Sequence, residues 1–172
     1  MLALLERGWC LVQLGNADAG IPLLTAGATG WHELGFVIYR PWTLTVLGDG
    51  CRVAAQWHAA LEHISEAQRL AEHTEDRWFQ AETFRLRGDV LLAMGDCIGA
   101  EAGYREAFAL AQHQSAKLWE LRAATSLARL WRDQGKCIEA QDLLAPVYGW
   151  FTEGFGTPVL QEAKVLLEEL AG

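Results

Sequence analysis

Positive charge is scarce in this sequence of 172 residues, where 14 Lys and Arg stand against 22 Asp and Glu and give a formal charge of −8. A nucleic-acid-binding protein needs a basic surface to neutralise phosphates, so we expect no nucleic-acid partner. Long apolar runs are missing too, and none approaches the ~18–20 residues of a membrane-spanning helix. The apolar start ends at Glu6 and has no basic segment before it, which is not typical of a signal peptide.

Paired cysteines are also absent. The four cysteines are far apart, and no two of them form a Cys-x-x-Cys pair. In an acidic chain without a signal peptide this pattern indicates free thiols, and it favours a cytoplasmic protein with no membrane contact. The cysteines are Cys10, Cys51, Cys97 and Cys137.

Catalytic and cofactor motifs are missing in the same way. Gly48-Asp49-Gly50 begins like a dinucleotide fingerprint, but Val53 stands where the third glycine is needed, and there is no phosphate-binding loop. His58 and His63 are five residues apart, which places them on different faces of a helix and not at one metal site. No nucleophile, base and oxyanion donor can be grouped. We therefore expect no catalytic, cofactor or metal site and a non-enzymatic protein.

What the sequence does contain is enough apolar material for one globular domain. Hydrophobic residues make up 51% of the chain and charged residues 21%, which excludes general disorder. Tryptophan is unusually frequent, with eight residues.

The sequence repeats itself with a period of forty residues. Five columns keep their residue type across four units without a gap, which predicts a repeat architecture. Small residues dominate four of these columns, and large apolar residues dominate the fifth. The columns are Gly8, Gly48, Gly88 and Ala128; Gly15, Ala55, Gly95 and Gly135; Gly20, Ala60, Ala100 and Ala140; Leu24, Ile64, Tyr104 and Leu144; and Gly27, Ala67, Ala107 and Val147.

Each unit has the pattern of a helical hairpin. In residues 81–94, Phe84, Leu91 and Met94 recur at helical spacing, and Gly88 allows a neighbouring helix to approach. Gly95 then ends the helix, and a second apolar stripe runs through residues 98–112. We expect small residues where the two helices cross.

This pattern resembles the tetratricopeptide repeat. The matching positions are Phe84, Gly88, Leu91, Ala100, Tyr104 and Ala107. The usual Leu before the glycine is Arg87, the closing Pro is Gln112, and each unit is about six residues longer than the usual 34. Residues 118–170 are also similar to the C-terminal repeats of bacterial proteins that join a cyclase or DNA-binding domain to an NTPase. The resemblance implies a regulatory interaction module without the activities of those missing domains.

We therefore predict an all-α fold, a right-handed superhelical stack of four tetratricopeptide-like hairpins and a capping helix. The units are expected at about 1–40, 41–80, 81–120 and 121–156. Thr157 and Pro158 are typical of a helix start and predict the capping helix over 157–171. Pro41 similarly predicts that the second unit's first helix begins near residue 41.

The first helices of such hairpins line a concave groove. Three of their columns change residue type while the scaffold repeats, which favours recognition of a partner over an unconstrained solvated face. Basic residues gather at the far end, so we expect a protein or peptide partner with an acidic segment. The alternative is that Arg129 and Arg132 pair with carboxylates of the chain itself. The candidate groove residues are Trp9, Asp49, Arg52, Arg85, Asp89, Arg122, Arg129 and Arg132.

The tryptophans divide between core and surface. Trp131 shares a column with Leu91 and is expected in the core, and Trp78 and Trp119 are expected to pack between hairpins. The candidates for an exposed aromatic patch are Trp9, Trp31, Trp42 and Trp57.

The first helix has no earlier unit to cover it. We expect Leu2, Leu5 and Trp9 to form a homodimer interface, because an apolar patch that covers itself is the simplest closed solution. Two alternatives to a partner-binding module stay open: a self-assembling structural domain, and a small-molecule sensor that would need a closed pocket with convergent polar groups.

Overall fold

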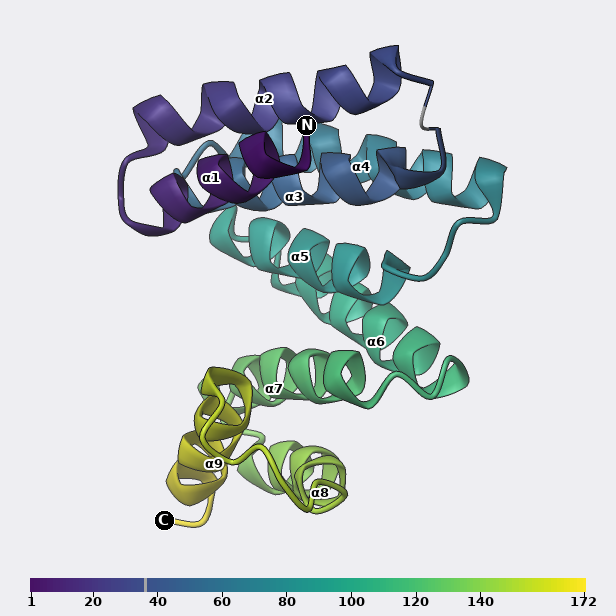
Figure 1. The fold of residues 1–172 in the computed structure, drawn as a ribbon. Coiled ribbons are helices and arrows are strands. Elements are labelled where there is room, and N and C mark those ends of the chain that lie inside the picture. Colours follow the sequence, from purple (N-terminus) through teal and green to yellow (C-terminus); the bar gives the residue numbers. More distant parts are fainter. Residues whose placement is uncertain (36) are drawn as a thin grey trace.

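The computed structural model describes residues 1–35 and 37–172, and the regular structure in this part of the chain is entirely helical (Figure 1). A short 3-10 helix, η1, covers Val37–Tyr39. The α-helices are α1 (Leu2–Gln13), α2 (Ala17–Glu33), α3 (Arg40–Val53), α4 (Trp57–Thr74), α5 (Gln80–Ala93), α6 (Cys97–His113), α7 (Lys117–Asp133), α8 (Cys137–Tyr148) and α9 (Pro158–Leu170).

The helices pair into four antiparallel hairpins that stack in chain order, and α9 packs on the last of them. Each first helix also contacts the next first helix, so that α1, α3, α5, α7 and α9 follow one another along one side of the stack. This confirms the predicted superhelical stack of four tetratricopeptide-like hairpins with a terminal helix. α3 begins one residue before Pro41, whereas α7 begins at Lys117, before the expected start of the fourth unit at 121. None of the described helices is long and apolar enough to cross a membrane.

The turn inside each hairpin contains one residue with a left-handed backbone. At Gly15, Gly95 and Gly135 the φ angle is +82°, +89° and +79°, which glycine adopts without steric cost. The equivalent residue of the second hairpin is Ala55, with φ +57°, where the Cβ is crowded. Small residues therefore recur in this column because the backbone is left-handed at each of its four positions.

Replacing Ala55 by glycine should stabilise the protein by about 0.5–1 kcal/mol, because the left-handed conformation no longer carries a Cβ. Ala54→Gly is the matched control: Ala54 has φ −78°, so glycine there only adds freedom to the unfolded chain and should destabilise. Urea denaturation measures both. Midpoints that move in the same direction for the two variants would contradict this account.

The predicted small residues lie where helices cross. A Cβ placed on Gly20 would lie 2.6 Å from the carbonyl oxygen of Gly8, so the backbones of α1 and α2 are in direct contact. A Cβ placed on Gly88 would lie 2.5 Å from the ring of Tyr104, which fills the groove beside the crossing of α5 and α6. The forty-residue columns thus correspond to one recurring packing arrangement.

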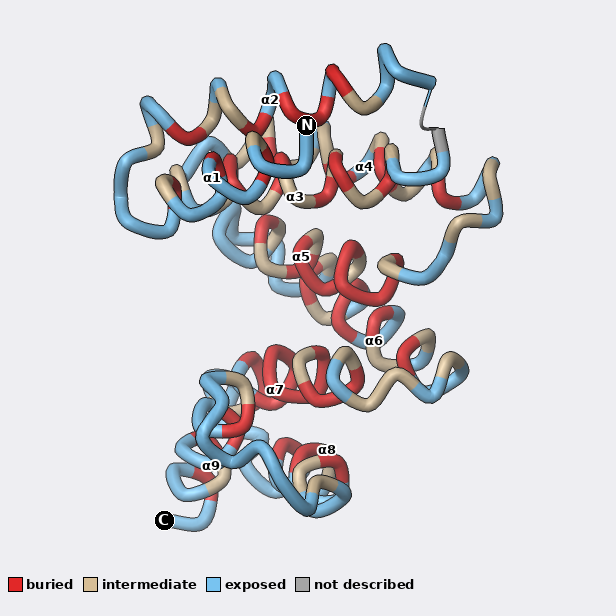
Figure 2. The backbone as a smooth tube through the Cα atoms, viewed as in Figure 1, coloured by how far each residue is buried: buried red, intermediate tan, exposed pale blue. Residues whose placement is uncertain are grey.

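Buried residues concentrate on α5 and α7, in the middle of the stack (Figure 2). The core has two clusters, one centred on hairpins 1 and 2 and one on hairpins 3 and 4 with α9. Trp131 belongs to the second cluster and is 9% exposed, as its column predicted.

Charged residues occupy both ends of the stack. Glu168 of α9 stands at the column of Gly8 and Ala128, where a following helix would have to cross, and it is exposed. Arg7 of α1 stands at the column of the buried Leu47 and Leu127 and of the half-buried Arg87, and it is exposed too.

Candidate functional site: the concave groove

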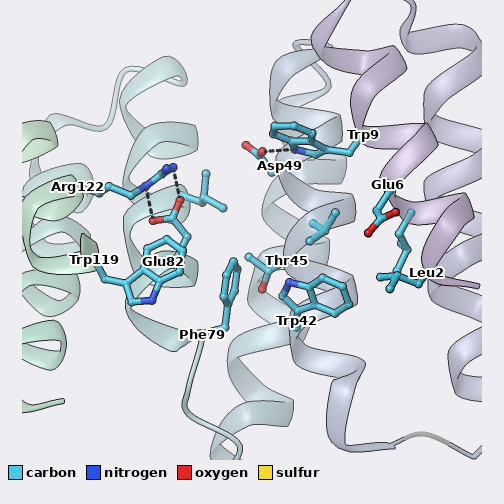
Figure 3. A pocket seen from close by; sticks show the side chains of 13 residues that line it. Leu2, Glu6, Trp9, Trp42, Thr45, Asp49, Phe79, Glu82, Trp119 and Arg122 are labelled. Atoms are coloured by element: carbon cyan, nitrogen blue, oxygen red, sulfur yellow. Dashed lines mark hydrogen bonds and ion pairs between the residues drawn. The ribbon is translucent and has the colours of Figure 1, made fainter. Parts of the chain in front are cut away.

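The first helices line an open cavity of about 300 Å³ on the side of the stack that they share (Figure 3). Its wall is mostly aromatic and aliphatic, with a few charged residues among them. α1, α3, α5 and α7 all contribute, so four hairpins build one site. The lining residues are Leu2, Leu5, Glu6, Trp9, Trp42, Thr45, Val46, Asp49, Phe79, Glu82, Leu86, Trp119 and Arg122.

Two repeat columns supply much of this wall, and of their members at the cavity only Arg122 was expected in the groove. One is the column seven residues before Trp9, which contains Leu2, Trp42, Glu82 and Arg122. The other, three residues before Trp9, places Glu6, Val46 and Leu86 at the cavity. Residues seven and three positions before Trp9 lie on the same helix face as Trp9. This spacing could therefore have predicted that both columns line the groove.

Aromatic rings follow one another along the starts of the first helices. The ring centroids of Trp42 and Trp78 are 6.3 Å apart, those of Trp78 and Phe79 are 5.2 Å apart, and those of Phe79 and Trp119 are 5.2 Å apart. Trp78 and Trp119 thus contact rings of the neighbouring hairpins, Trp42 and Phe79, as expected. Trp78 is also 50% exposed, and Trp119 also lines the cavity.

The predicted exposed patch is only partly present. Trp9 is 41% exposed, and it lines the cavity together with the half-buried Trp42. Trp57 and Trp31 are half-buried, pack against the first core cluster, and do not line the cavity, and Trp31 lies edge-on to Tyr39.

Buried ion pairs form the floor of the groove between α5 and α7. Glu82 accepts two hydrogen bonds from Arg85, at 2.7 and 2.9 Å, and two from Arg122, at 2.7 and 3.1 Å. The Glu82 side chain is only 5% exposed, so its carboxylate depends on these guanidinium groups in place of water. Arg122 also lies over the ring of Trp119, at 5.6 Å from the centroid.

Arg85 extends this network to the neighbouring helices. Its Nη1 donates to Asp89 at 2.7 Å and to Ser126 of α7 at 3.4 Å, and Asp89 accepts from the Tyr104 hydroxyl at 2.9 Å. Burial alone would lower the pKa of Arg85, but the carboxylates of Glu82 and Asp89 raise it above its usual value. Burial and the nearby Asp89 carboxylate raise the pKa of Tyr104, which stays a hydrogen-bond donor.

A second cavity of about 420 Å³ continues the groove towards α9. It shares Trp9, Asp49 and Arg122 with the first cavity, and its other lining residues are mostly polar. At the junction Asp49 accepts hydrogen bonds from the Trp9 indole at 3.1 Å and from Arg52 at 2.7 and 2.9 Å. The remaining lining residues are Gln13, Arg52, Arg85, Thr125, Ser126, Arg129, Pro158, Val159 and Glu162.

The structure separates the eight candidate groove residues. It brings Trp9, Asp49, Arg52, Arg85, Arg122 and Arg129 to one or both cavities. Asp89 lies behind the wall as a partner of Arg85 and Tyr104. Arg132 lies outside both cavities and binds Asp133 and Glu169, while Arg129 contacts Glu162 at 4.0 Å. Arg132 therefore pairs with carboxylates of the chain itself, which was the alternative to partner binding, whereas Arg129 has only one long contact of this kind.

The dimer candidates on α1 also divide. Leu5 is 2% exposed and packs against Gly27 of α2, so it offers almost no surface to a second copy. Leu2 and Trp9 are 46% and 41% exposed, but they point into the groove cavity and not to the outer end of the stack. One face of α1 packs against α2, so the apolar residues on that face, such as Leu5, are buried within the first hairpin.

The chain is similar in fold to solved helical-repeat proteins. The nearly identical TPR-like repeats of a kinesin light chain-type protein from Podosopora anserina align over 98% of this chain and 92% of theirs, with 17% identity and a TM-score of 0.70. A variant of those repeats gives the same values. A Rap protein complexed with Competence and Sporulation Factor aligns over 98% of this chain with 17% identity and a TM-score of 0.78, and the chain spans 52% of that protein. No protein-family model and no curated protein matches the sequence. At this identity the likeness shows a tetratricopeptide-like fold.

Proposed function

We propose that the chain is a regulatory protein-interaction module that holds a segment of a partner protein in its concave groove. The observation that carries this proposal is the aromatic cavity, which is open to the groove and built by four hairpins. Exposed aromatic side chains in a concave site are typical of interfaces, because they bury much area with few rotatable bonds. The Rap protein of similar fold, complexed with Competence and Sporulation Factor, supports a binding role for such a stack.

The polar atoms of the cavity favour a protein segment over a small-molecule ligand. Thr45 binds Thr83 at 2.9 Å, Asp49 binds Trp9 and Arg52, and Glu82 binds two arginines. These groups are occupied within the chain, and Glu6 is the one charged residue of the described lining without such a contact. A small-ligand site instead needs several convergent polar groups that fix the ligand's orientation. An apolar side chain from a partner requires no such groups.

Selection from a phage-displayed library of random peptides tests the proposal. The wild-type protein should enrich peptides that Trp42→Ala and Trp119→Ala fail to bind, because each variant removes one wall of the cavity; we expect at least about tenfold weaker binding. Trp150→Ala is the matched control, since Trp150 is 57% exposed and lies outside the groove. Peptides that bind the wild type and Trp42→Ala equally well would refute the groove as the binding site.

Self-association is a second candidate function, favoured by the exposure of Met1, Leu2 and Trp9 at one end of the groove. A second copy could cover these side chains, each worth roughly 1.5–3 kcal/mol when fully buried. We therefore predict a homodimer at micromolar concentration that Trp9→Glu weakens and Glu168→Lys, on the far α9, leaves intact. Light scattering coupled to size exclusion measures the mass, and a monomer of about 19 kDa for the wild type would contradict the prediction.

A further inference from the structure

We infer that the partner segment carries one large apolar side chain with a basic residue on one side of it and an acidic residue on the other. This inference rests on the proposed function, and it adds the chemistry and the direction of the bound segment. Three observations lead to it: the apolar cavity, the unequal charges of the two connected cavities, and the positions of Glu6 and Arg129, neither of which has a side-chain hydrogen bond with a described residue.

The charges along the groove differ from one end to the other. The lining of the first cavity contains three acidic residues, Glu6, Asp49 and Glu82, and one arginine. The lining of the second contains four arginines, Arg52, Arg85, Arg122 and Arg129, and two acidic residues. The cavities share a boundary at Trp9, Asp49 and Arg122, so the groove changes from acidic to basic across its length.

Most of these charges neutralise one another. Among the charged residues that line the two cavities, the side chains of Glu6, Arg129 and Glu162 have no hydrogen-bond or ion-pair partner closer than 4.0 Å in the described part of the chain. Asp49, Arg52, Glu82, Arg85 and Arg122 all form ion pairs or hydrogen bonds of 2.7 Å within the chain. Glu6 is exposed and has no hydrogen bond or ion pair with any described residue. In Figure 3 it lies beside Leu2 on α1, across the cavity from Arg122.

Arg129 and Glu162 lie at the other end. Their side chains are 47% and 64% exposed, and the ion pair between them is 4.0 Å long, which is too long for a hydrogen bond, so the Arg129 guanidinium can turn to a partner. Of these two cavities, Glu6 lines the first and Arg129 the second, so the aromatic cavity lies on the side of Glu6 and the boundary residues separate the two charges. A segment with its apolar side chain in the cavity therefore meets a carboxylate towards α1 and a guanidinium towards α7 and α9. Complementary charges at both ends would fix its direction.

Charge reversal at each end tests the inference in the same peptide selection. The wild type should enrich peptides with an aromatic or leucine residue between a basic and an acidic residue. Glu6→Lys should change the preference on the basic side alone, and Arg129→Glu should change it on the acidic side alone. Glu72→Lys is the control, because Glu72 is exposed on α4 outside both cavities.

Binding of a synthetic copy of the most enriched peptide gives the magnitude. Each reversal replaces an attraction by a repulsion, so we expect the dissociation constant to rise about tenfold, and the rise to shrink at high salt. If the wild type, Glu6→Lys and Arg129→Glu all select peptides with the same residues beside the apolar one, the inference is overturned, although the groove would still be a binding site. No enrichment over Trp42→Ala would overturn the proposed function itself. A wild-type dimer that the peptide cannot dissociate would show a second copy in the groove and would also overturn the inference.

Discussion

Replacing Arg85 by alanine should cost about 3–5 kcal/mol of folding stability, the largest effect that we expect from a single substitution on the groove floor. Arg85 is 7% exposed and is hydrogen-bonded to two carboxylates, Glu82 and Asp89, at 2.7–2.9 Å. Its removal leaves the buried Glu82 with Arg122 alone and exposes a cavity where the side chain lay. Urea denaturation at neutral pH measures the change in the free energy of unfolding.

The matched control is Arg69→Ala on α4. Arg69 pairs with Glu66 in the same geometry, three residues apart and with a nitrogen–oxygen distance of 2.7 Å, but the Arg69 side chain is 66% exposed. Solvent screens such a pair, so this variant should leave the denaturation midpoint almost unchanged. Equal losses for Arg85→Ala and Arg69→Ala would show that burial of the Arg85 network does not matter for stability.

Removing the carboxylates together with the cation tests the cause of the loss. The triple variant Glu82→Gln, Arg85→Met, Asp89→Asn has no buried charge without a partner among these three positions. It should therefore be more stable than Arg85→Ala, since the cost of a broken buried pair comes mainly from the charge that stays behind.

The repeat columns made the fold predictable from the sequence. Small residues recur at helix crossings because only they let two backbones approach, as Gly8 and Gly20 do. Glycine also recurs at Gly15, Gly95 and Gly135 because the backbone there is left-handed. The close helix crossing and the left-handed turn both lie within one hairpin. Each hairpin repeats them, so they are visible in the sequence as columns with a forty-residue period.

The site was less predictable because it depends on how hairpins are placed relative to one another. The column of Trp9 was expected in the groove, but Trp42 and Glu82 were missed, although they lie on the same helix face seven residues earlier in their units. Spacing alone shows which residues share a face. It does not show how far that face turns towards the neighbouring unit.

Charge pairing across helices was the other gap. Arg85 was expected to face a partner, yet it is buried because α7 brings Ser126 and Arg122 close to it and to Glu82, some forty residues away in the sequence. A column that varies in charge can thus encode an internal network as well as a recognition surface. Arg129 and Arg132 look alike in the sequence, but Arg132 pairs with Asp133 and with Glu169 of α9, whereas Arg129 has only a 4.0 Å contact with Glu162 of α9.

Overpacking the crossing of α5 and α6 should give the second large effect. Ala100 is fully buried, and a Cβ on Gly88 would lie 3.1 Å from the Ala100 carbonyl oxygen, so the two helices are in contact at this point. Ala100→Leu adds three carbon atoms where no space exists and should cost about 1–3 kcal/mol. For a chain of this size that lowers the melting temperature by about 2–4 °C per kcal/mol.

Ala116→Leu is the control for this substitution. Ala116 is half-buried in the link between α6 and α7, at the N-cap position of α7, and faces no helix crossing of the repeat columns. The same added volume should therefore be accommodated at the surface with a much smaller loss. Thermal melts followed by circular dichroism compare the two variants with the wild type. Coinciding melting curves would mean that the crossing tolerates a large residue, and the recurring small column at Gly20, Ala60, Ala100 and Ala140 would then need a cause other than close helix packing.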